Sequence, residues 1–363
     1  MRCKIAILPG DGIGGEIIPE SIKVLNKIGL KFEHEFLFDY GNIGGNAIDK
    51  MGVPLPTETL KLCEDSDAIL FGAVGGPKWD DMNAKYRPED GILSLRKSME
   101  LFANLRPVKI FPALISSSPL KSELIGDVDM VIVRELTGGL YFSQPKKRWV
   151  SNGERYGVDT LGYSESEIDR ILRVGFELAK TRRSKLTSAD KANVLETSRL
   201  WRELAVEISK DYPEVEIDHM YVDNLSMQLI SQPGRFDVIV TENTFGDILS
   251  DEAAVLIGSL GMLPSASLAY SDNKSKDKRV GLYEPVHGSA PDIAGKSIAN
   301  PIGAILSVGL MLGYSFSLFK EAEAINRAVN AVLDMGYRSA DIASRKEKSI
   351  STSEMGDLIT EYI

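Results

Sequence analysis

Residues 236–254, FDVIVTENTFGDILSDEAA, contain the two neighbouring patterns that decide the fold. The first seven residues, FDVIVTE, are rich in β-branched and aromatic side chains and predict a buried strand. A turn at 243–246 follows, and Asp247 and Asp251 then lie four positions apart in a segment that we expect to be helical. A strand that leads into a helix indicates a mixed α/β protein.

The same alternation of strand and helix patterns extends over the rest of the chain. A helix is expected from about 15 to 28, and further strands are predicted at 4–8 (KIAIL), 31–38 (KFEHEFLF), 67–74 (DAILFGAV), 129–136 (DMVIVREL) and 215–223 (VEIDHMYVD). This order favours an α/β sheet over a helical bundle or a β-sandwich. With 363 residues, the chain exceeds the length that a single hydrophobic core usually serves, so two lobes are expected.

Composition excludes several classes of function. The formal net charge of −10 repels nucleic acid and anionic membrane surfaces, so neither is an expected partner. Two cysteines, Cys3 and Cys63, are too few for a disulfide framework and suit a reducing compartment, so a cytoplasmic location is expected. The uncharged stretch 302–319 contains glycines and serines and predicts a buried helix rather than a membrane span.

Two polar segments interrupt the regular pattern. Residues 148–170, RWVSNGERYGVDTLGYSESEIDR, form either an arm that crosses to a partner subunit or an ordinary surface loop. Residues 271–279, SDNKSKDKR, are expected to be a solvated loop without a function.

A glycine-rich turn at 10–15, GDGIGG, satisfies the pattern G-x-G-x-x-G of a dinucleotide-binding Rossmann fold, and Asp39 is a candidate for its ribose-binding acid. Such a pattern arises easily in a chain with 32 glycines, and Asp11 would place a negative charge beside the pyrophosphate. A tight strand-to-helix turn that needs glycine dihedral angles is therefore the favoured interpretation.

Three carboxylates are candidate ligands of a divalent cation. Asp247 and Asp251 share one face of the expected helix, where their charges repel unless a cation lies between them, and hard oxygen ligands suit Mg²⁺ or Mn²⁺. Asp223 ends the predicted strand HMYVD and could complete the site. The alternative is that Asp247 and Asp223 cap helices and that Asp251 is solvated.

Arg96, Arg106 and Arg134 are candidate carboxylate-binding residues, because a guanidinium grips a carboxylate bidentately. Tyr141 follows a double glycine, and Lys191 lies between a strand-like stretch and a helix, so both are candidates for acid/base chemistry. Each of these residues taken singly is as well explained by a surface or structural role.

The motifs taken together resemble the β-decarboxylating dehydrogenase family, that of the isocitrate and isopropylmalate dehydrogenases. The matching segments span almost the whole chain: GDGIG, LFGAVGGPKW, GILSLRKSMELFANLRPVK, VRELTGGLYF, DKANVL, YVDN, NTFGDILSDEAA, GLYEPVHGSAPDIAGKSIANP and EMGD. The family usually has a proline at the position of Gly15, and this one difference creates the apparent Rossmann motif.

The resemblance implies a two-lobed α/β fold that is not a Rossmann fold. Residues 1–101 and 255–363 would form a discontinuous NAD-binding lobe, and residues 102–254 a dimerisation lobe with the metal and substrate residues. It also implies a homodimer in which Lys191 and Asp223 are contributed to the neighbouring active site.

The resemblance further assigns the ligands. NAD adenosine would lie along His287, Gly288, Ser289, Ala290, Pro291, Asp292 and Asn300, with the nicotinamide end near the stretch from Gly76 to Glu89. A carboxylate at position 292 binds the ribose hydroxyls and repels a 2′-phosphate, so NAD is preferred to NADP. Arg96, Arg106, Arg134 and Asp223 would bind substrate, and Asp223, Asp247 and Asp251 would bind Mg²⁺ or Mn²⁺.

The reaction implied is oxidation of a hydroxy di-acid followed by decarboxylation, with Lys191 as base, Tyr141 as the acid that protonates the enolate, and Asp223 assisting. Ile92, Leu93 and Val194 offer an apolar pocket, which favours 3-isopropylmalate and its conversion to 4-methyl-2-oxopentanoate in leucine biosynthesis. Homoisocitrate, isocitrate and tartrate are the rival substrates. A dimeric binding protein without activity and a Rossmann-type binding module are the alternatives from other classes.

Overall fold

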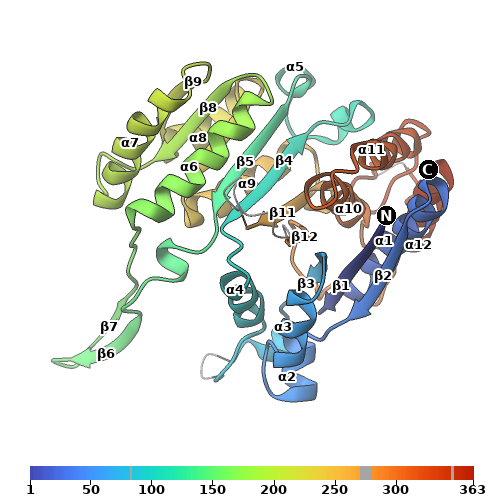
Figure 1. Ribbon diagram of the computed structural model, residues 1–363, viewed down its shortest axis with the longest axis horizontal. Helices are drawn as coiled ribbons and strands as arrows, with labels where there is room; N and C mark the ends of the chain where they lie inside the picture. The colour runs from blue at the N-terminus through green and yellow to red at the C-terminus, as the bar shows by residue number, and fades with distance from the viewer. Residues whose placement is uncertain (82–83, 270–279, 345–346) are drawn as a thin grey trace. The chain divides into compact units, whose positions relative to one another are not determined.

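The computed structural model describes residues 1–81, 84–269, 280–344 and 347–363, which form two compact units (Figure 1). Unit 1 comprises Met1–Leu101, Ile110–Gly126 and Ala254–Ile363, and unit 2 comprises Phe102–Lys109 and Asp127–Ala253. Residues 110–126 were expected in the second lobe but belong to unit 1. Arg338 Nη2 donates a hydrogen bond to the carbonyl oxygen of Ala113 (2.8 Å), which ties this segment to the C-terminal part of the chain.

Unit 1 is built on a sheet with the strand order β2-β1-β3-β12-β11, parallel except where β11 pairs with β12. Its strands are β1 (Arg2–Gly10), β2 (Glu35–Tyr40), β3 (Ala68–Ala73), β11 (Pro264–Leu268) and β12 (Gly281–Pro285). Its helices are α1 (Gly14–Phe32), α2 (Gly45–Met51), α3 (Thr57–Glu64), α4 (Pro88–Ser98), α5 (Ser122–Ile125), α10 (Ile302–Tyr314), α11 (Phe319–Asp334) and α12 (Thr352–Tyr362). Both chain termini lie in this unit, where α1 packs against α12 (Figure 1).

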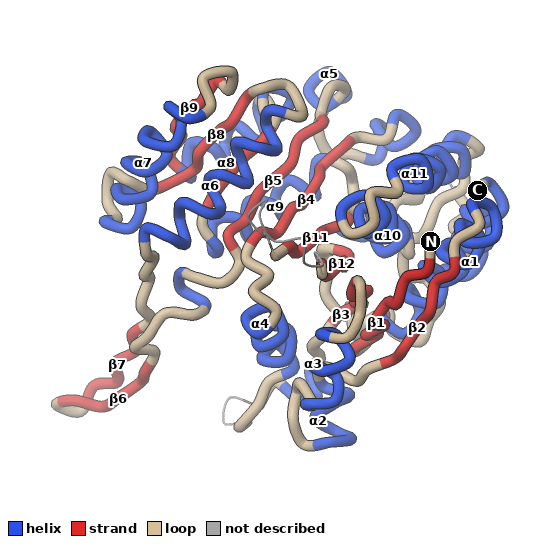
Figure 2. Tube along the Cα trace, in the orientation of Figure 1, coloured by secondary structure: helices blue, strands red, loops and turns tan. Residues whose placement is uncertain are grey.

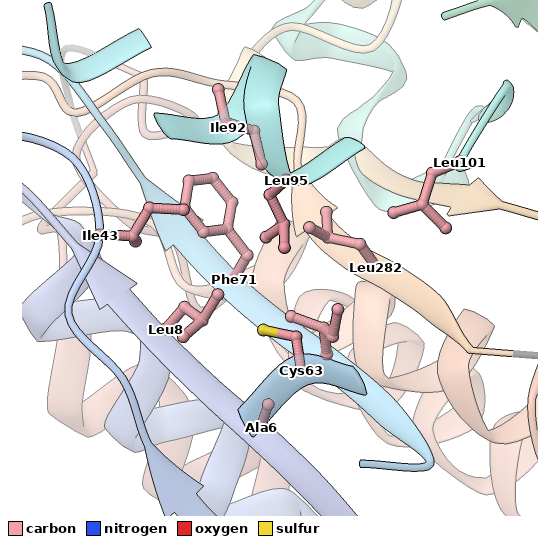
Figure 3. Close-up of a cluster of buried hydrophobic side chains, with 10 residues drawn as sticks. Ala6, Leu8, Ile43, Cys63, Phe71, Ile92, Leu95, Leu101 and Leu282 are labelled. Carbon is pink, nitrogen blue, oxygen red and sulfur yellow. The ribbon is translucent and has the colours of Figure 1, made fainter. Parts of the chain in front are cut away.

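The core of unit 1 covers both faces of its sheet. Successive residues of a strand point to opposite faces, so one face receives a different set of side chains from the other. On one face a cluster joins strands to α3 and α4 (Figure 3): Ala6, Leu8, Ile43, Cys63, Ile69, Phe71, Ile92, Leu95, Leu101 and Leu282. Ile5 and Ile7 are also fully buried, because α1 and α10 pack on the sheet as well. A parallel sheet covered on both faces explains the continuous apolar run of the first strand.

Unit 2 has a sheet with the strand order β4-β5-β10-β8-β9, parallel except where β4 pairs with β5. Its strands are β4 (Ala103–Lys109), β5 (Asp129–Glu135), β8 (Lys185–Asp190), β9 (Glu216–Tyr221) and β10 (Val238–Thr241). Its helices are α6 (Glu165–Lys180), α7 (Glu196–Ile208), α8 (Val222–Ser231) and α9 (Asn243–Leu256), which continues past the end of the unit. The alternation of strands and helices in both units (Figure 2) confirms the expected α/β class.

The polar segment at 148–170 begins within a hairpin of β6 (Lys147–Ser151) and β7 (Glu154–Val158), which extends away from the other elements of unit 2 (Figure 1). Nine of its ten strand residues are exposed, and Trp149 stacks on Tyr156 with ring centroids 5.3 Å apart. A two-stranded hairpin is only marginally stable in water unless it packs against other elements. The exposure of β6 and β7 means that this hairpin lacks such packing within the chain.

Several element boundaries differ from the sequence-based expectation, and the residues 243–246 that were expected to form a turn are the first turn of α9. Helix α1 continues to Phe32, and Glu33, in the left-handed conformation, ends it by donating its N–H to the Gly29 carbonyl, so the strand predicted from residue 31 begins only at Glu35. Strand β9 ends at Tyr221, and Asp223 lies in the first turn of α8 rather than at the end of a strand.

Residues 302–314 of the apolar stretch at 302–319 form α10, whose residues are buried around nearly the whole helix, as expected for a buried helix. None of the helices in the described ranges is long and apolar enough to cross a membrane. The predicted solvated loop at 271–279 lies outside the described residues.

Candidate active site

Two arginines and two aspartates meet in unit 2, on β4, β5 and α9. Arg106 and Arg134 belong to neighbouring antiparallel strands, and Asp247 and Asp251 lie one turn apart on α9. The position of Asp247 in the second turn excludes the alternative that it is the N-cap of this helix. Helix α9 can approach β5 closely because Gly246 packs on Arg134, where a Cβ atom would lie 2.7 Å from the arginine side chain.

Asp247 receives hydrogen bonds from three side chains. Its Oδ1 atom accepts from Arg134 Nη1 and lies 3.4 Å from Arg106 Nη2, while its Oδ2 atom accepts from the Tyr141 hydroxyl at 3.0 Å. Arg106 Nη1 also lies 3.5 Å from Asp251 Oδ1. Both guanidiniums are buried, whereas the Asp251 side chain is 58% exposed, so the aspartates form the accessible side of this neutral cluster.

Three polar residues that the sequence analysis missed hold the two arginines in place. Asn243 Oδ1 accepts from Arg134 Nε and Nη2 at 3.0 and 2.8 Å. For Arg106, Nε donates to Asn104 Oδ1 at 2.7 Å and Nη1 donates to Ser250 Oγ at 2.5 Å. Asn243 lies two residues after the end of β10, and this place near a strand end is the signal that could have identified it.

Tyr141 is placed by the turn after β5. Gly139 has a φ of +71°, which favours glycine, and the chain then turns so that the phenol reaches Asp247. Burial raises the pKa of the Tyr141 phenol, and the neighbouring Asp247 carboxylate raises it further. The hydroxyl therefore stays protonated at neutral pH, as a proton donor must.

A buried hydrogen-bond network supports this turn, and the sequence analysis missed its residues as well. The Tyr163 hydroxyl lies 3.2 Å from Glu135 Oε2 and 3.3 Å from Glu242 Oε2, and it accepts the N–H of Asn243 at 3.0 Å. Glu135 accepts the N–H of Gly138 at 2.8 Å, so the network connects the turn before Tyr141 with the start of α9. Burial raises the pKa of both glutamates above the usual carboxyl range.

Lys191 and Asp223 form a separate pair in unit 2. Lys191, directly after β8, donates to Asp223 Oδ1 at 2.7 Å, and this hydrogen bond lowers the pKa of the Asp223 carboxyl. In the described part of the chain, no three His, Cys, Asp or Glu side chains are grouped so that they could hold a metal ion. A single chain therefore does not bring Asp223 together with Asp247 and Asp251.

The remaining predicted substrate residues have different surroundings. Arg96, in unit 1, is buried and donates to Glu284 Oε1 at 2.6 Å, while its Nε atom has no partner among the described residues. Ile92 packs into the core of unit 1, and Leu93 beside it is half-buried. Val194, in unit 2, is 61% exposed. Of the three apolar residues, Leu93 and Val194 retain accessible surface.

The predicted adenosine-binding segment follows β12 in unit 1. His287 Nε2 is buried without a partner among the described residues, and Gly288, Pro291 and Asp292 are exposed. Asn300, by contrast, is buried and already engaged, since its Oδ1 accepts the N–H of Ile302 and its Nδ2 donates to Asp341. Ser289 is buried, and Ala290, which follows it, is half-buried with a φ of +41°.

Three backbone N–H groups of the glycine-rich turn at 10–15 donate to protein acceptors. Asp11 N–H donates to the Ala73 carbonyl at 2.8 Å, and Ile13 N–H donates to the Ser289 carbonyl at 2.9 Å. Asp39, the acid that a Rossmann site would use, is exposed on β2 and pairs with Lys4 at 3.3 Å. The N–H groups of Asp11 and Ile13 are therefore not available to pyrophosphate, unlike those of a Rossmann turn.

Comparisons with known proteins identify the family of the chain. Residues 4–359 match the family described as isocitrate/isopropylmalate dehydrogenase. The chain is 59% identical to the 3-isopropylmalate dehydrogenase of Geobacillus kaustophilus, over 97% of this chain and 93% of that protein. It is 56% identical to the 3-isopropylmalate dehydrogenase of Aquifex aeolicus, over 100% and 97% of the two chains.

Among solved structures, isocitrate dehydrogenase from Methylococcus capsulatus matches with a TM-score of 0.86 and 36% identity over 99% of both chains. Such agreement covers the whole sequence rather than a single motif. The chain belongs to the isocitrate/isopropylmalate dehydrogenase family.

Proposed function

We propose that this chain catalyses the NAD-dependent oxidative decarboxylation of 3-isopropylmalate to 4-methyl-2-oxopentanoate and CO₂, a step of leucine biosynthesis. The observation that carries the proposal is the cluster of Arg106, Arg134, Asp247 and Asp251 with the Tyr141 hydroxyl at 3.0 Å from Asp247. The relatives named 3-isopropylmalate dehydrogenase, at 54–59% identity, support this choice of substrate.

The acidic side of the cluster suits a divalent cation. Asp247 and Asp251 offer carboxylate oxygens one helical turn apart, and such hard ligands match Mg²⁺ or Mn²⁺. Asp223 of a second copy would complete the ligand set. When bound, the cation polarises the substrate hydroxyl and the later carbonyl, and NAD accepts the hydride.

The basic side of the cluster suits a substrate with two carboxylates. Arg106 and Arg134 are held by Asn104 and Asn243, so little side-chain entropy remains to be lost when a carboxylate binds. Arg96 retains an unpartnered Nε among the described residues and would bind a further carboxylate oxygen. Leu93 and Val194 would contact the isopropyl group, while Ile92 would support Leu93 from the core.

Two residues divide the proton transfers. Lys191 of the second copy would remove the hydroxyl proton, and its partner Asp223 holds the amine in place at 2.7 Å. Tyr141 remains protonated because burial and Asp247 raise the pKa of its phenol, so it would donate the proton that forms the ketone.

NAD would bind along the segment after β12 in unit 1. The unpartnered His287 Nε2 offers a hydrogen bond to the adenosine, and the exposed Asp292 would accept from the ribose hydroxyls and repel the 2′-phosphate of NADP. The adenosine subsite would be shaped by Gly288, Ser289, Ala290 and Pro291, and Asn300 would hold the end of this segment. The nicotinamide would lie near Gly76 and Glu89.

A homodimer is part of the proposal, because the base and the third metal ligand lie apart from the arginine cluster in one chain. Apolar side chains are exposed on α8 and α9, where Met227, Ile230 and Ile248 are 63%, 47% and 63% exposed. The hairpin of β6 and β7 would pack against the second copy. Cys3 and Cys63 are free thiols, which suits a reducing compartment, so we place the enzyme in the cytoplasm.

The test is a stoichiometric assay with 3-isopropylmalate, NAD and Mg²⁺ or Mn²⁺. NADH, CO₂ and 4-methyl-2-oxopentanoate should appear in equal amounts. Asp247→Asn should abolish turnover with the fold preserved, while the matched substitution Asp218→Asn, at an exposed site on β9, should have little effect. Undiminished activity in a thoroughly chelated sample would contradict the proposal.

A further inference from the structure

The Asp11 side chain is buried in the glycine-rich turn of unit 1 and connects two other segments. Only 3% of the residue is exposed. Its Oδ2 atom accepts the N–H groups of Gly45 at 2.8 Å and Gly75 at 3.0 Å, and its Oδ1 atom accepts the N–H of Asn46 at 2.8 Å. One carboxylate thus joins the start of α2 to the loop after β3.

Helix α2 in turn holds the residues that follow this loop. Trp79 Nε1 donates to Asp49 Oδ1 at 3.2 Å, and Lys78 Nζ donates to Asp49 Oδ2 at 2.5 Å. The indole ring packs on Gly45, where a Cβ atom would lie 2.4 Å from it. Asp11 therefore fixes residues 75–79 in two ways, directly at Gly75 and indirectly through α2.

The same turn also contacts the segment after β12. Ile13 N–H donates to the Ser289 carbonyl at 2.9 Å, and a Cβ atom on Gly12, at a φ of +55°, would lie 2.0 Å from that oxygen. Ser289 also approaches the loop after β3, since its Oγ and Glu89 Oε1 lie 3.7 and 2.8 Å from the Cβ position of Gly75. All of these contacts lie within unit 1.

We infer that the glycine-rich turn at 10–14 organises the NAD site without binding the pyrophosphate, and that Asp11 is its positioning residue. The inference rests on the proposed function, which places the nicotinamide end near Gly76 and the adenosine near Ser289. The turn contacts both segments on the side that faces the rest of the protein. The glycines of the turn allow the two segments to approach it closely. The Asp11 carboxylate accepts hydrogen bonds from backbone N–H groups of the protein, whereas a Rossmann turn donates its own N–H groups to phosphate.

The test compares NADH binding, measured by fluorescence titration, with steady-state kinetics. Asp11→Asn replaces one carboxylate oxygen with an NH₂ group, which cannot accept a hydrogen bond from a backbone N–H. The loop after β3 therefore loses part of its support. The dissociation constant of NADH and the KM for NAD should rise about tenfold, the scale on which loss of a supporting partner weakens a bound group. The KM for 3-isopropylmalate should change little, and a general loss of folding would not produce this separation.

Two further variants keep the test decisive. Asp49→Ala removes the acceptor of Trp79 and Lys78 at the surface of α2, so it should weaken NADH binding by a smaller factor without unfolding unit 1. Asp39→Asn, the same substitution at the acid that a Rossmann site would need, should leave NADH binding unchanged. If Asp11→Asn does not fold, a normal NADH affinity in Asp49→Ala overturns the inference.

Asp292→Ala separates this inference from the proposed function. Weaker NADH binding in both Asp292→Ala and Asp11→Asn supports the inference. Weaker binding in Asp292→Ala alone overturns the role of Asp11 and leaves the proposed cofactor site intact. Unchanged binding in both variants overturns the inference together with the placement of NAD.

Discussion

Asp247 connects the charges of the candidate site with its proton donor. One carboxylate oxygen accepts from Arg134 and the other from the Tyr141 hydroxyl. A cation bound here would therefore lie beside the phenol that is to donate a proton. In the proposed mechanism, this proximity would suit Tyr141 to a late step, after CO₂ has left and charge has accumulated on the substrate oxygen.

Separate substitutions should distinguish the base from the acid. Lys191→Met should suppress NADH formation itself, since the hydroxyl keeps its proton. Tyr141→Phe should spare NADH formation more than ketone formation, because the phenol acts only after oxidation. General acid/base groups contribute about 10²- to 10⁴-fold, so both losses should be measurable. A single-turnover experiment that follows NADH and ketone separately checks this. Equal loss of both signals in a folded Tyr141→Phe variant would refute the division.

Single residues differ in how far the sequence alone could predict them. Arg106, Arg134 and Asp247 could be proposed from charge and spacing, and the structure brings them together. Tyr163 and Glu242 could not, because they are far apart in sequence and their hydrogen bonds depend on the packed fold. Ile92 was expected in a substrate pocket, but it packs in the core of unit 1. Apolar residues of a core and of a pocket look alike in sequence.

At the scale of elements, the first turn of α1 offers a test of the unusual Gly15. A Cβ atom on this exposed helical residue would meet no atom within 4 Å, whereas one on Gly14 would lie 2.0 Å from the Pro9 carbonyl oxygen. Gly15→Ala should therefore stabilise unit 1 by about 0.5–1 kcal/mol through reduced chain entropy. Gly14→Ala should destabilise it by roughly 1–3 kcal/mol. Calorimetric melting of the two variants checks both signs, and a lower Tm for Gly15→Ala would contradict the account.

The junction between β5, β10 and α9 predicts a dependence of stability on pH. Burial raises the pKa of Glu242, so folding favours its protonated form and its contribution to stability is lost as the pH rises toward the folded-state pKa. Glu242→Gln cannot ionise, and its amide can still accept from Phe245 and donate to Tyr163. Relative to the wild type, this variant should gain stability on the order of 1 kcal/mol between pH 5 and pH 8.

Thermal melting of both proteins at the two pH values measures this difference. Glu207→Gln, at an exposed position on α7, is the matched control and should show no such gain. A Glu242→Gln variant whose stability relative to the wild type is the same at both pH values would show that Glu242 does not titrate in this way.

The α/β alternation was predictable from the sequence, but β4, β11 and β12 were not predicted, and the boundaries of other elements were placed only approximately. Apolar runs identified β1, β3, β5, β9 and β10, but the start of β2 was placed too early because Lys31 and Phe32 suit either a helix end or a strand. Asp223 was assigned to a strand for a similar reason, since Val222 continues the apolar pattern of β9 into the first turn of α8.

At the scale of the whole molecule, shared active sites predict complementation between inactive variants. Lys191→Met and Asp247→Asn should each be inactive alone. In a heterodimer of the two, one site combines the intact Asp247 of one chain with the intact Lys191 of the other. Random mixing should therefore restore about a quarter of wild-type activity, since half the dimers are mixed and each has one intact site.

The control for this experiment mixes Asp247→Asn with Arg134→Gln. Both substitutions affect the same side of the site, so no mixed dimer has an intact one and activity should stay absent. Co-expression with two affinity tags isolates the mixed dimers for assay. Absence of recovery in the Lys191→Met and Asp247→Asn pair, or a monomeric wild type in sedimentation, would rule out shared sites.

The most direct test of the proposed function is a comparison of kcat/KM for 3-isopropylmalate, homoisocitrate, isocitrate and tartrate, with NAD and a divalent cation at saturation. The four substrates share the hydroxy di-acid and differ in the group that Leu93 and Val194 would contact. An apolar surface gives no partner to a carboxylate or hydroxyl, so 3-isopropylmalate should be preferred by at least about a hundredfold. An equal or higher kcat/KM for any of the other three would contradict the account.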